Sequence, residues 1–150
     1  MESVQNVVPA YIEHYKPRED EMEKASNGYL MSVMVIMAGM PLPIINLLAT
    51  SAFYLFNRKS TYYVRWHCMQ ALLSQLTIMV INSIALTWTI RAFTGRVPFT
   101  DKYFAYMVLV IALNIIEIIL NIIAAIRVRK GIHVSYFFWS ELADFFTAKR

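Results

Sequence analysis

The chain has 150 residues, of which 58% are hydrophobic and only 16% are charged. A soluble domain usually carries charge on about a quarter of its residues, so this composition argues against an ordinary soluble globular protein. The formal net charge of +4 would favour nucleic-acid binding if the basic residues formed one patch. They stand instead at the ends of apolar runs, where they serve topology and lipid headgroups, so we expect no nucleic-acid partner.

The N-terminal segment is polar. Residues 1–28 are predicted to form a tail with a net charge of −3, ahead of a helical membrane domain over residues 29–150. The start has no basic segment followed by a short apolar core, so we expect no cleavable signal peptide.

The first apolar run covers residues 29–56, and Pro41 and Pro43 interrupt it. Each proline lacks a backbone N–H and disfavours helix at the residue before it. We predict one transmembrane span that is kinked or broken at the prolines, because neither half is long enough to cross a bilayer alone. A re-entrant hairpin of two half-helices is the alternative.

The next segment contains a histidine beside the only cysteine, Cys68. Adjacent residues on a helix point about 100° apart, which argues against both a metal site and a Cys–His nucleophile. We therefore expect no metal, no cofactor and no enzymatic activity. The residues here are predicted instead to anchor the start of a span at the lipid headgroups. They are Tyr63, Arg65, His67 and Gln70.

Two further spans are predicted at about residues 68–90 and 103–126. After them, residues 134–148 are too short and too charged to cross, and their aromatic side chains fall on one helical face. We predict an amphipathic helix that lies in the membrane interface, or else packs on the bundle. The chain is thus expected to be an all-α membrane protein with three transmembrane helices. The distribution of Lys and Arg in this multi-pass protein favours a C-terminus in the cytoplasm.

Polar side chains inside the predicted spans are the main candidates for function. Glu117 lies near the middle of the third span, and Asn114 and Asn121 share its helical face. The second span carries Gln75 and Asn82 on a small and polar stripe. These groups are expected to face each other, either as hydrogen-bonded contacts between helices or as the lining of a hydrophilic cleft.

Three stretches together resemble a known family. They are "PLPIINLL", "YLFNRKSTYYVRWHCMQALLSQ" and "NIIAAIRVRKGIHVSYFF", within residues 29–138. In their order they resemble small bacterial membrane proteins grouped with the twenty-kilodalton subunit of the chloroplast inner-envelope protein import translocon. The box that opens the second span in that family maps onto Tyr63, Val64, Arg65, His67, Gln70 and Ala71. The family's chloroplast members look like four-span proteins, and Glu117 matches no motif of the family.

The resemblance implies a non-enzymatic accessory subunit of a larger membrane-protein complex, a translocon or an insertase, with lipid headgroups as further contacts. It also implies a location in the bacterial inner (cytoplasmic) membrane. A small oligomeric channel or proton-linked transporter, with Glu117 lining a polar path, is the first alternative. A lipid-binding structural membrane protein is the second.

Overall fold

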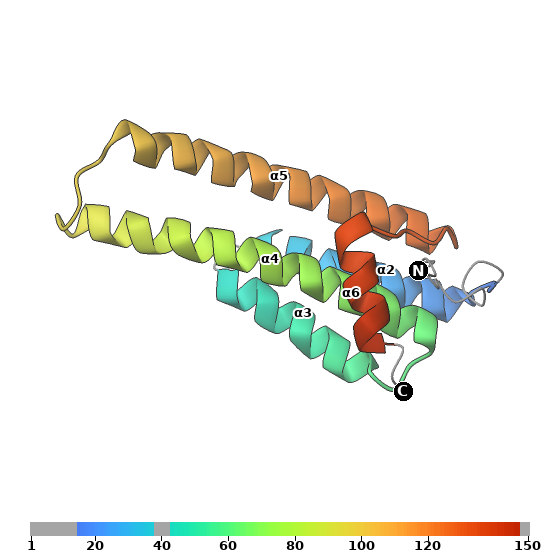
Figure 1. Cartoon of the computed structure of the whole chain (residues 1–150). Coiled ribbons are helices and arrows are strands. Elements are labelled where there is room, and N and C mark those ends of the chain that lie inside the picture. Colours follow the sequence, from blue (N-terminus) through green and yellow to red (C-terminus); the bar gives the residue numbers. More distant parts are fainter. Residues whose placement is uncertain (1–14, 38–42, 148–150) are drawn as a thin grey trace, which may run out of the picture.

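The computed structural model describes residues 15–37 and 43–147, and within these ranges it contains helices and short connections but no strand. This confirms the predicted all-α class. The helices are α2 (Glu19–Met37), α3 (Pro43–Asn57), α4 (Tyr62–Phe93), α5 (Asp101–Arg129) and α6 (Phe137–Thr147). Figure 1 shows that α4 and α5 form a long antiparallel pair.

Helices α4 and α5 are long and apolar enough to cross a membrane. At 1.5 Å per residue, their 32 and 29 residues extend about 48 and 44 Å, which exceeds a hydrocarbon core of about 30 Å. Only 39% and 28% of the residues in their most apolar windows are buried. The core helix of a soluble protein would be mostly buried, so the exposed apolar surface here suits lipid.

The connections at both ends of α5 explain where that helix begins and ends. Thr100 precedes it, and its side-chain oxygen accepts a hydrogen bond from the backbone N–H of Tyr103 at 3.4 Å. Arg127 and Arg129 lie in the last turn, where cations favour the negative end of the helix dipole. Gly131 then adopts a φ of +76°, which turns the chain back and which other residues rarely adopt.

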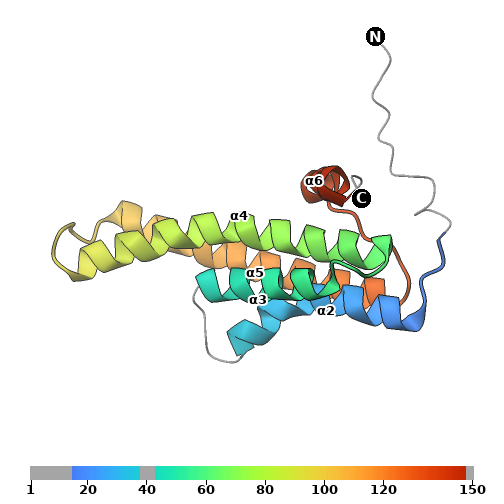
Figure 2. The same cartoon turned by 90° about the horizontal axis from the view of Figure 1, so that it is seen from below.

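The predicted kinked span over residues 29–56 is wrong. Two separate antiparallel helices, α2 and α3, take its place, and they contact each other as well as α4 (Figure 2). Pro43 is the first residue of α3, a position where its missing N–H costs nothing, whereas Pro41 lies outside the described residues. The prediction of one kinked span rested on the fact that neither half of residues 29–56 can cross the bilayer alone. In the structure each half is a separate helix that packs against the other and against α4.

Helix α2 also includes residues that were predicted to belong to a polar tail. It starts at Glu19 and continues through Gly28 without interruption. The start of α2 is partly buried within the protein, because Ala25 and Ser26 pack against its other helices.

Helix α3 is too short to span a bilayer, because its 15 residues extend only about 22 Å.

The two short helices cover only one end of the long pair. Figures 1 and 2 agree that α2 and α3 lie along the half of α4 near its start, while the far ends of α4 and α5 extend beyond them. The starts of α2 and α4 and the ends of α3 and α5 all lie at the same end of the molecule. The connection between α4 and α5 lies at the opposite end.

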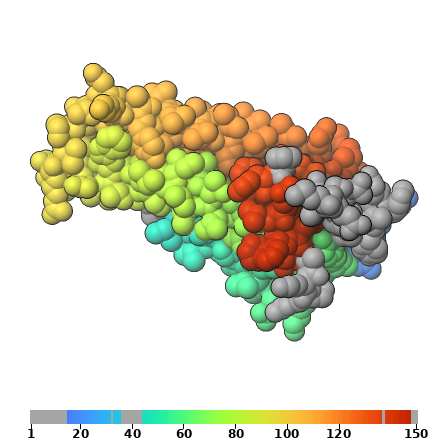
Figure 3. All heavy atoms as spheres, in the orientation of Figure 1, coloured from blue at the N-terminus to red at the C-terminus, as the bar shows by residue number. Residues whose placement is uncertain are grey.

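The C-terminal helix α6 lies across α4, as the space-filling view shows (Figure 3). Ala143 and Thr147 are buried on the side that faces the protein. Phe138, Phe145 and Phe146 are 65%, 64% and 55% exposed. The aromatic face that was predicted to enter the membrane interface is therefore turned away from the bundle, and the small and polar face contacts α4.

Candidate functional site

The interface between α4 and α5 is built around Glu117. Gln75 of α4 and Asn121 of α5 both donate side-chain hydrogen bonds to Oε1 of the Glu117 carboxyl group. Glu117 is 8% exposed, and both of its donors are buried more deeply. The structure therefore brings together three of the five polar residues that the sequence singles out within the spans.

The other two residues of that set form a second contact further along the same interface. Asn82 Nδ2 donates to Asn114 Oδ1 at 2.9 Å, and Asn114 Nδ2 donates back to Asn82 Oδ1 at 2.7 Å. Near the far end, the hydroxyl groups of Thr89 and Tyr103 lie 3.0 Å apart. The hydroxyl group of Tyr106 on α5 also donates to the backbone carbonyl of Ile81 on α4 at 3.2 Å, so four polar contacts join the two helices at successive levels. In lipid, which offers no hydrogen bonds, such contacts favour one register of the two helices over the others.

A cavity of about 170 Å³ lies beside the Glu117 contact. Residues of α4 and α5 form most of its wall, and Tyr136 and Trp139 line one side. The hydroxyl group of Tyr136 donates to the backbone carbonyl of Leu120 at 2.6 Å, and Trp139 Nε1 donates to Thr77 Oγ1 at 3.2 Å. The segment that follows α5 is therefore held against one side of this partly open cavity.

A second polar cluster lies at the start of α4 and centres on His67, which is fully buried. Its Nδ1 lies 2.9 Å from the hydroxyl group of Tyr29 on α2, and its Nε2 lies 3.2 Å from Nδ1 of His133. Both nitrogen atoms of the ring are therefore engaged. His67 joins α2 to the segment after α5, two parts of the chain that are about a hundred residues apart.

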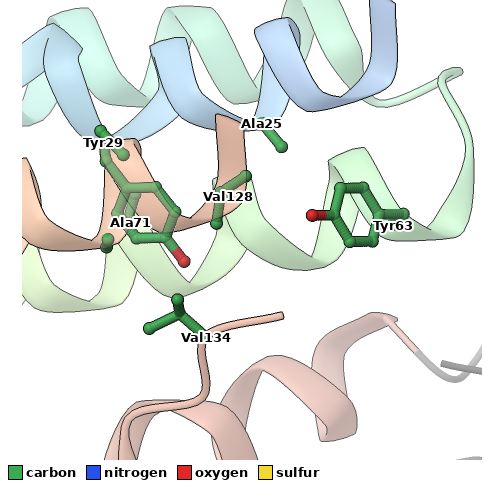
Figure 4. Packing of buried hydrophobic residues seen from close by; sticks show 8 residues of the cluster. Ala25, Tyr29, Tyr63, Ala71, Val128 and Val134 are labelled. Carbon is green, nitrogen blue, oxygen red and sulfur yellow. The ribbon is translucent and has the colours of Figure 1, made fainter. Parts of the chain in front are cut away.

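Gln70 completes this cluster. Its Nε2 donates to the Tyr29 hydroxyl group at 2.9 Å and to the backbone carbonyl of Val134 at 3.2 Å, while its Oε1 accepts from the backbone N–H of Tyr136 at 3.3 Å. Figure 4 shows Ala71 beside the Tyr29 ring and Val134 near its hydroxyl end, so apolar packing surrounds these polar bonds. The combination fixes α2, α4 and the 130–136 segment to one another.

The predicted headgroup anchor does not form at this place. Tyr63, His67 and Gln70 are buried, and Arg65 is only partly exposed with its Nε buried and without a hydrogen-bond partner among the described residues. The sequence prediction assumed that α4 begins in contact with lipid. Helices α2 and α6 cover that surface, so the aromatic and polar side chains contact protein instead.

Two titratable groups outside the spans have shifted pKa values. Burial lowers the pKa of His133, although the nearby Asp144 carboxylate acts in the opposite direction. Burial alone would raise the pKa of Glu21, but the backbone N–H of Arg18 and the hydroxyl group of Tyr15 donate to its carboxylate and hold the pKa below its usual value.

The sequence reasoning missed several residues of these clusters. Tyr29, His133 and Asp144 were not singled out, although Asp144 accepts hydrogen bonds from Trp66 Nε1 at 2.6 Å and from the Tyr62 hydroxyl group at 3.3 Å. The available signal was Gly131, since a glycine turn after a long helix returns the next segment along it. Among the residues that the structure describes, no group of three or more His, Cys, Asp or Glu side chains is placed to hold a metal ion.

These features define a helical protein with two membrane-length apolar helices, held together by polar contacts along the α4–α5 interface and by a buried polar cluster at the start of α4. The chain belongs to the magnetosome magnetite crystal formation protein family (MamF/MmsF), whose model matches residues 25–142. No curated protein and no solved structure matches it. The family and the two to three apolar helices are consistent with a membrane location.

The family match corrects the resemblance that was drawn from the sequence. The chain does not belong to the family of the chloroplast import translocon, and the predicted role in protein translocation or insertion is wrong. The predicted alternatives, a channel or proton-linked transporter and a lipid-binding structural protein, do not match the family either. The stretches that carried the resemblance contain a proline break, a basic and aromatic helix start and a glycine stop. Many small helical membrane proteins need these features whatever their function.

Proposed function

We propose that this protein takes part in magnetite crystal formation as a non-enzymatic, multi-pass component of the magnetosome membrane. The family match carries this proposal, because residues 25–142 include most of α2 and all of α3, α4 and α5. It also extends into α6, so the match covers both polar clusters. The proposal thus concerns the whole described bundle rather than one segment of it.

The chemistry of the buried groups supports a structural role over a catalytic one. Glu117 and the four amide side chains of the α4–α5 interface hydrogen-bond with each other. His67 is fully buried and bonded through both ring nitrogen atoms. Groups that are engaged in this way hold helices in a fixed arrangement.

The distribution of basic residues supports an orientation in a bacterial inner membrane. Nine of the described Lys and Arg residues lie at the end of the molecule where α4 begins, against three at the end where α4 meets α5. The nine are Lys16, Arg18, Lys24, Arg58, Lys59, Arg65, Arg127, Arg129 and Lys130, and the three are Arg91, Arg96 and Lys102. Basic residues accumulate on the cytoplasmic side, so α6 faces the cytoplasm in this proposal and the basic loops there lie against lipid headgroups.

The far halves of α4 and α5 support participation in a larger membrane-protein complex. They extend beyond α2, α3 and α6, and they expose large apolar side chains. These include Val80, Ile84, Val108, Leu109 and Ile111. A two-helix segment leaves most of its surface available for lipid or for other helices.

Gene deletion in a magnetite-forming host tests the proposal. Cells without the gene are expected to form fewer or smaller magnetite crystals, and the wild-type gene is expected to restore them, as measured by electron microscopy of crystal number and diameter. Immunoblotting of membranes shows that the complementing protein is present. Unchanged crystals in the deletion strain would overturn the proposal.

Co-purification tests the complex. The tagged protein, extracted in mild detergent from cells that form magnetite, is expected to migrate on native gels as part of a larger assembly. Migration as a single chain at every detergent concentration would remove this part of the proposal and leave the part on crystal formation intact.

A further inference from the structure

Two exposed basic residues of α5 mark the levels of the two membrane surfaces. Lys102 and Arg127 lie about 38 Å apart along the helix, at 1.5 Å per residue. This distance exceeds a hydrocarbon core of about 30 Å by little more than the depth of the headgroups that such side chains reach. The contact between Asn82 and Asn114 lies near the midpoint of this distance, so it marks the middle of the bilayer.

Helices α2 and α3 stay on one side of that middle. Gly28 of α2 packs beside Cys68 of α4, and α2 ends at Met37, about 14 Å further along. Asn82 lies about 21 Å beyond Cys68, so α2 ends before the middle of the bilayer. Helix α3, about 22 Å long, then returns to the side from which α2 started (Figure 2). Both helices therefore lie in the leaflet at the start of α4, which we call the near leaflet.

Helix α6 lies in the near leaflet as well, and it runs across the bundle rather than along it (Figures 1 and 2). Asp144 accepts a hydrogen bond from Trp66, close to the start of α4, whereas Trp139 donates to Thr77, which lies about 16 Å deeper. Trp139 and Asp144 project about 140° apart around α6. Their two contacts fix the rotation of α6, with Trp139 on its deeper side and Asp144 on the side of the headgroups.

This rotation turns the aromatic side chains of α6 toward lipid. Phe146 projects within about 20° of Trp139 and therefore points deeper, while Phe138 and Phe145 point away from the bundle. The exposed Glu141 projects within about 60° of Asp144, on the side of the headgroups. An amphipathic helix placed in this way buries its apolar face at the boundary between headgroups and acyl chains.

The cross-section of the protein therefore differs between the two leaflets. Within the part of the chain that the structure describes, α2, α3, α4, α5 and α6 occupy the near leaflet, whereas only α4 and α5 continue through the opposite one. Each additional helix displaces lipid over a diameter of about 10 Å. A protein that is wider in one leaflet fits best where that leaflet is expanded, on the convex side of a curved bilayer.

We propose that this protein prefers strongly curved phospholipid membrane, with the near leaflet on the convex side. The α2–α3 hairpin supplies the greater width, and the aromatic face of α6 adds a shallow insertion into the same leaflet. In the orientation that the basic residues favour, the convex leaflet is the cytoplasmic one. The inference rests on the shape of the bundle and is independent of the proposed role in crystal formation.

Membrane tubes pulled from giant vesicles test this preference. The full-length protein is reconstituted, and a membrane-impermeant maleimide dye labels only the copies whose introduced thiol faces outward, since the native Cys68 is buried. Lys59→Cys reports copies with the near leaflet outside, which is the convex side of a tube, and Arg96→Cys reports the opposite orientation. We expect the protein-to-lipid fluorescence of the tube, relative to the vesicle, to exceed one for Lys59→Cys and to fall below one for Arg96→Cys. Both deviations should grow as the tube narrows.

Equal ratios for the two labels at every tube radius would overturn the proposal, because an asymmetric shape must sort the two orientations in opposite directions. That result would indicate that further helices, such as those of a second copy, fill the opposite leaflet. A ratio above one for Arg96→Cys and below one for Lys59→Cys would also overturn it, since the opposite leaflet would then be the wider one.

Two matched variants in the Lys59→Cys background measure the contribution of α6. Replacing Phe138 and Phe145 together by serine removes exposed rings without changing the contact of α6 with α4, and it is expected to lower the ratio toward one. Phe93→Ser removes a ring that is 78% exposed at the opposite end of the molecule, and it is expected to leave the ratio unchanged. An unchanged ratio in the double variant would overturn the lipid contact of α6.

Discussion

At Gly28, α2 approaches α4 closely. A Cβ atom added there would lie 3.1 Å from Sγ of Cys68 and 3.5 Å from its Cα. Cys68 is itself 1% exposed and cannot move aside without displacing its neighbours. The close approach lets the Tyr29 ring, one residue further on, reach His67 and Gln70.

A larger side chain at this position is expected to separate the two helices. Gly28→Leu should lower the free energy of unfolding by about 1–3 kcal/mol, the usual cost of overpacking an interior. The measurement is unfolding in mixed detergent micelles, followed by circular dichroism. Lys24→Leu, an exposed site on the same helix, is the control and should change the stability by about 0.5 kcal/mol or less. Equal effects of the two variants would contradict the close packing of α2 on α4.

His133 makes stability depend on pH. Burial lowers its pKa below the ordinary value of 6.5, so the unfolded chain takes up a proton at a higher pH than the folded protein does. Its contribution to stability is therefore present above pH 6.5 and is lost as the pH falls below that value. The groups that face it are His67 and Asp144, of which the latter opposes the shift.

The expected result is a fall in unfolding midpoint between pH 7.5 and pH 5.5 for the wild type, and a smaller fall for His133→Asn. The lowered pKa of Glu21 acts in a different window, because stability that depends on an ionised carboxylate is lost only as the pH falls below about 4.5. Identical pH profiles for the wild type and His133→Asn would remove His133 as the cause.

At this scale the sequence tells which side chains are unusual but not which ones meet. Glu117, Asn114 and Gln75 stand out because hydrocarbon offers polar groups no partner, so they must lie within the bundle. The meeting of His67 with His133 depends on the turn at Gly131 and on the return path of the chain. No local pattern contains that information, since the two residues are 66 positions apart.

At the scale of helices, the α4–α5 pair has a register that the Asn82 and Asn114 side chains specify through two mutual hydrogen bonds. We expect Asn82→Leu or Asn114→Leu alone to destabilise the pair by about 0.5–2 kcal/mol, because each leaves the remaining amide without its partner. The double variant should cost less than the sum of the two single changes. A double-mutant cycle of unfolding free energies measures this coupling, and strict additivity would show that the pair does not contribute to the register.

The docking of α6 depends on Asp144. Its carboxylate accepts from Trp66 Nε1 and from the Tyr62 hydroxyl group, both on the first turns of α4. Asp144→Ala is expected to weaken the docking by about 1–3 kcal/mol and to raise hydrogen exchange in residues 137–147, with little change in α5. Glu141→Ala, on the exposed side of the same helix, is the matched control. Unchanged exchange in α6 would mean that the exposed phenylalanine residues, rather than Asp144, hold it in place.

The helices differ in how far their sequence determines them. The apolar runs of α4 and α5 are long and uninterrupted by proline or glycine, so the existence of these two helices follows from hydropathy and length. The segment around the prolines allowed two geometries, and only the packing of α2 and α3 on α4 decides between them. The exposed aromatic face of α6 could be predicted, whereas the choice of Ala143 and Asp144 as its contact with α4 could not.

At the scale of the whole molecule, the α2–α3 hairpin determines which parts of the chain share a side of the membrane. A single first span would place the segment before it opposite the connection between α3 and α4. Because α3 returns along α2, the start of α2, the start of α4 and the end of α5 lie together, as Figures 1 and 2 show. Nine of the twelve described Lys and Arg residues fall on this side, a much stronger bias than a single first span would give.

Labelling of introduced cysteines tests this topology directly. Glu23→Cys, Lys59→Cys and Arg96→Cys place a thiol at exposed positions, and the native Cys68 is too deeply buried to react. With a membrane-impermeant maleimide on intact bacterial spheroplasts, only Arg96→Cys is expected to react. Glu23→Cys and Lys59→Cys should react after permeabilisation, and the wild-type protein in neither condition. Reaction of Glu23→Cys and Arg96→Cys from the same side would show that residues 19–57 cross the membrane once, contrary to the hairpin. Reaction of both Glu23→Cys and Lys59→Cys, but not of Arg96→Cys, in intact spheroplasts would invert the orientation, because the side with nine basic residues would then face away from the cytoplasm.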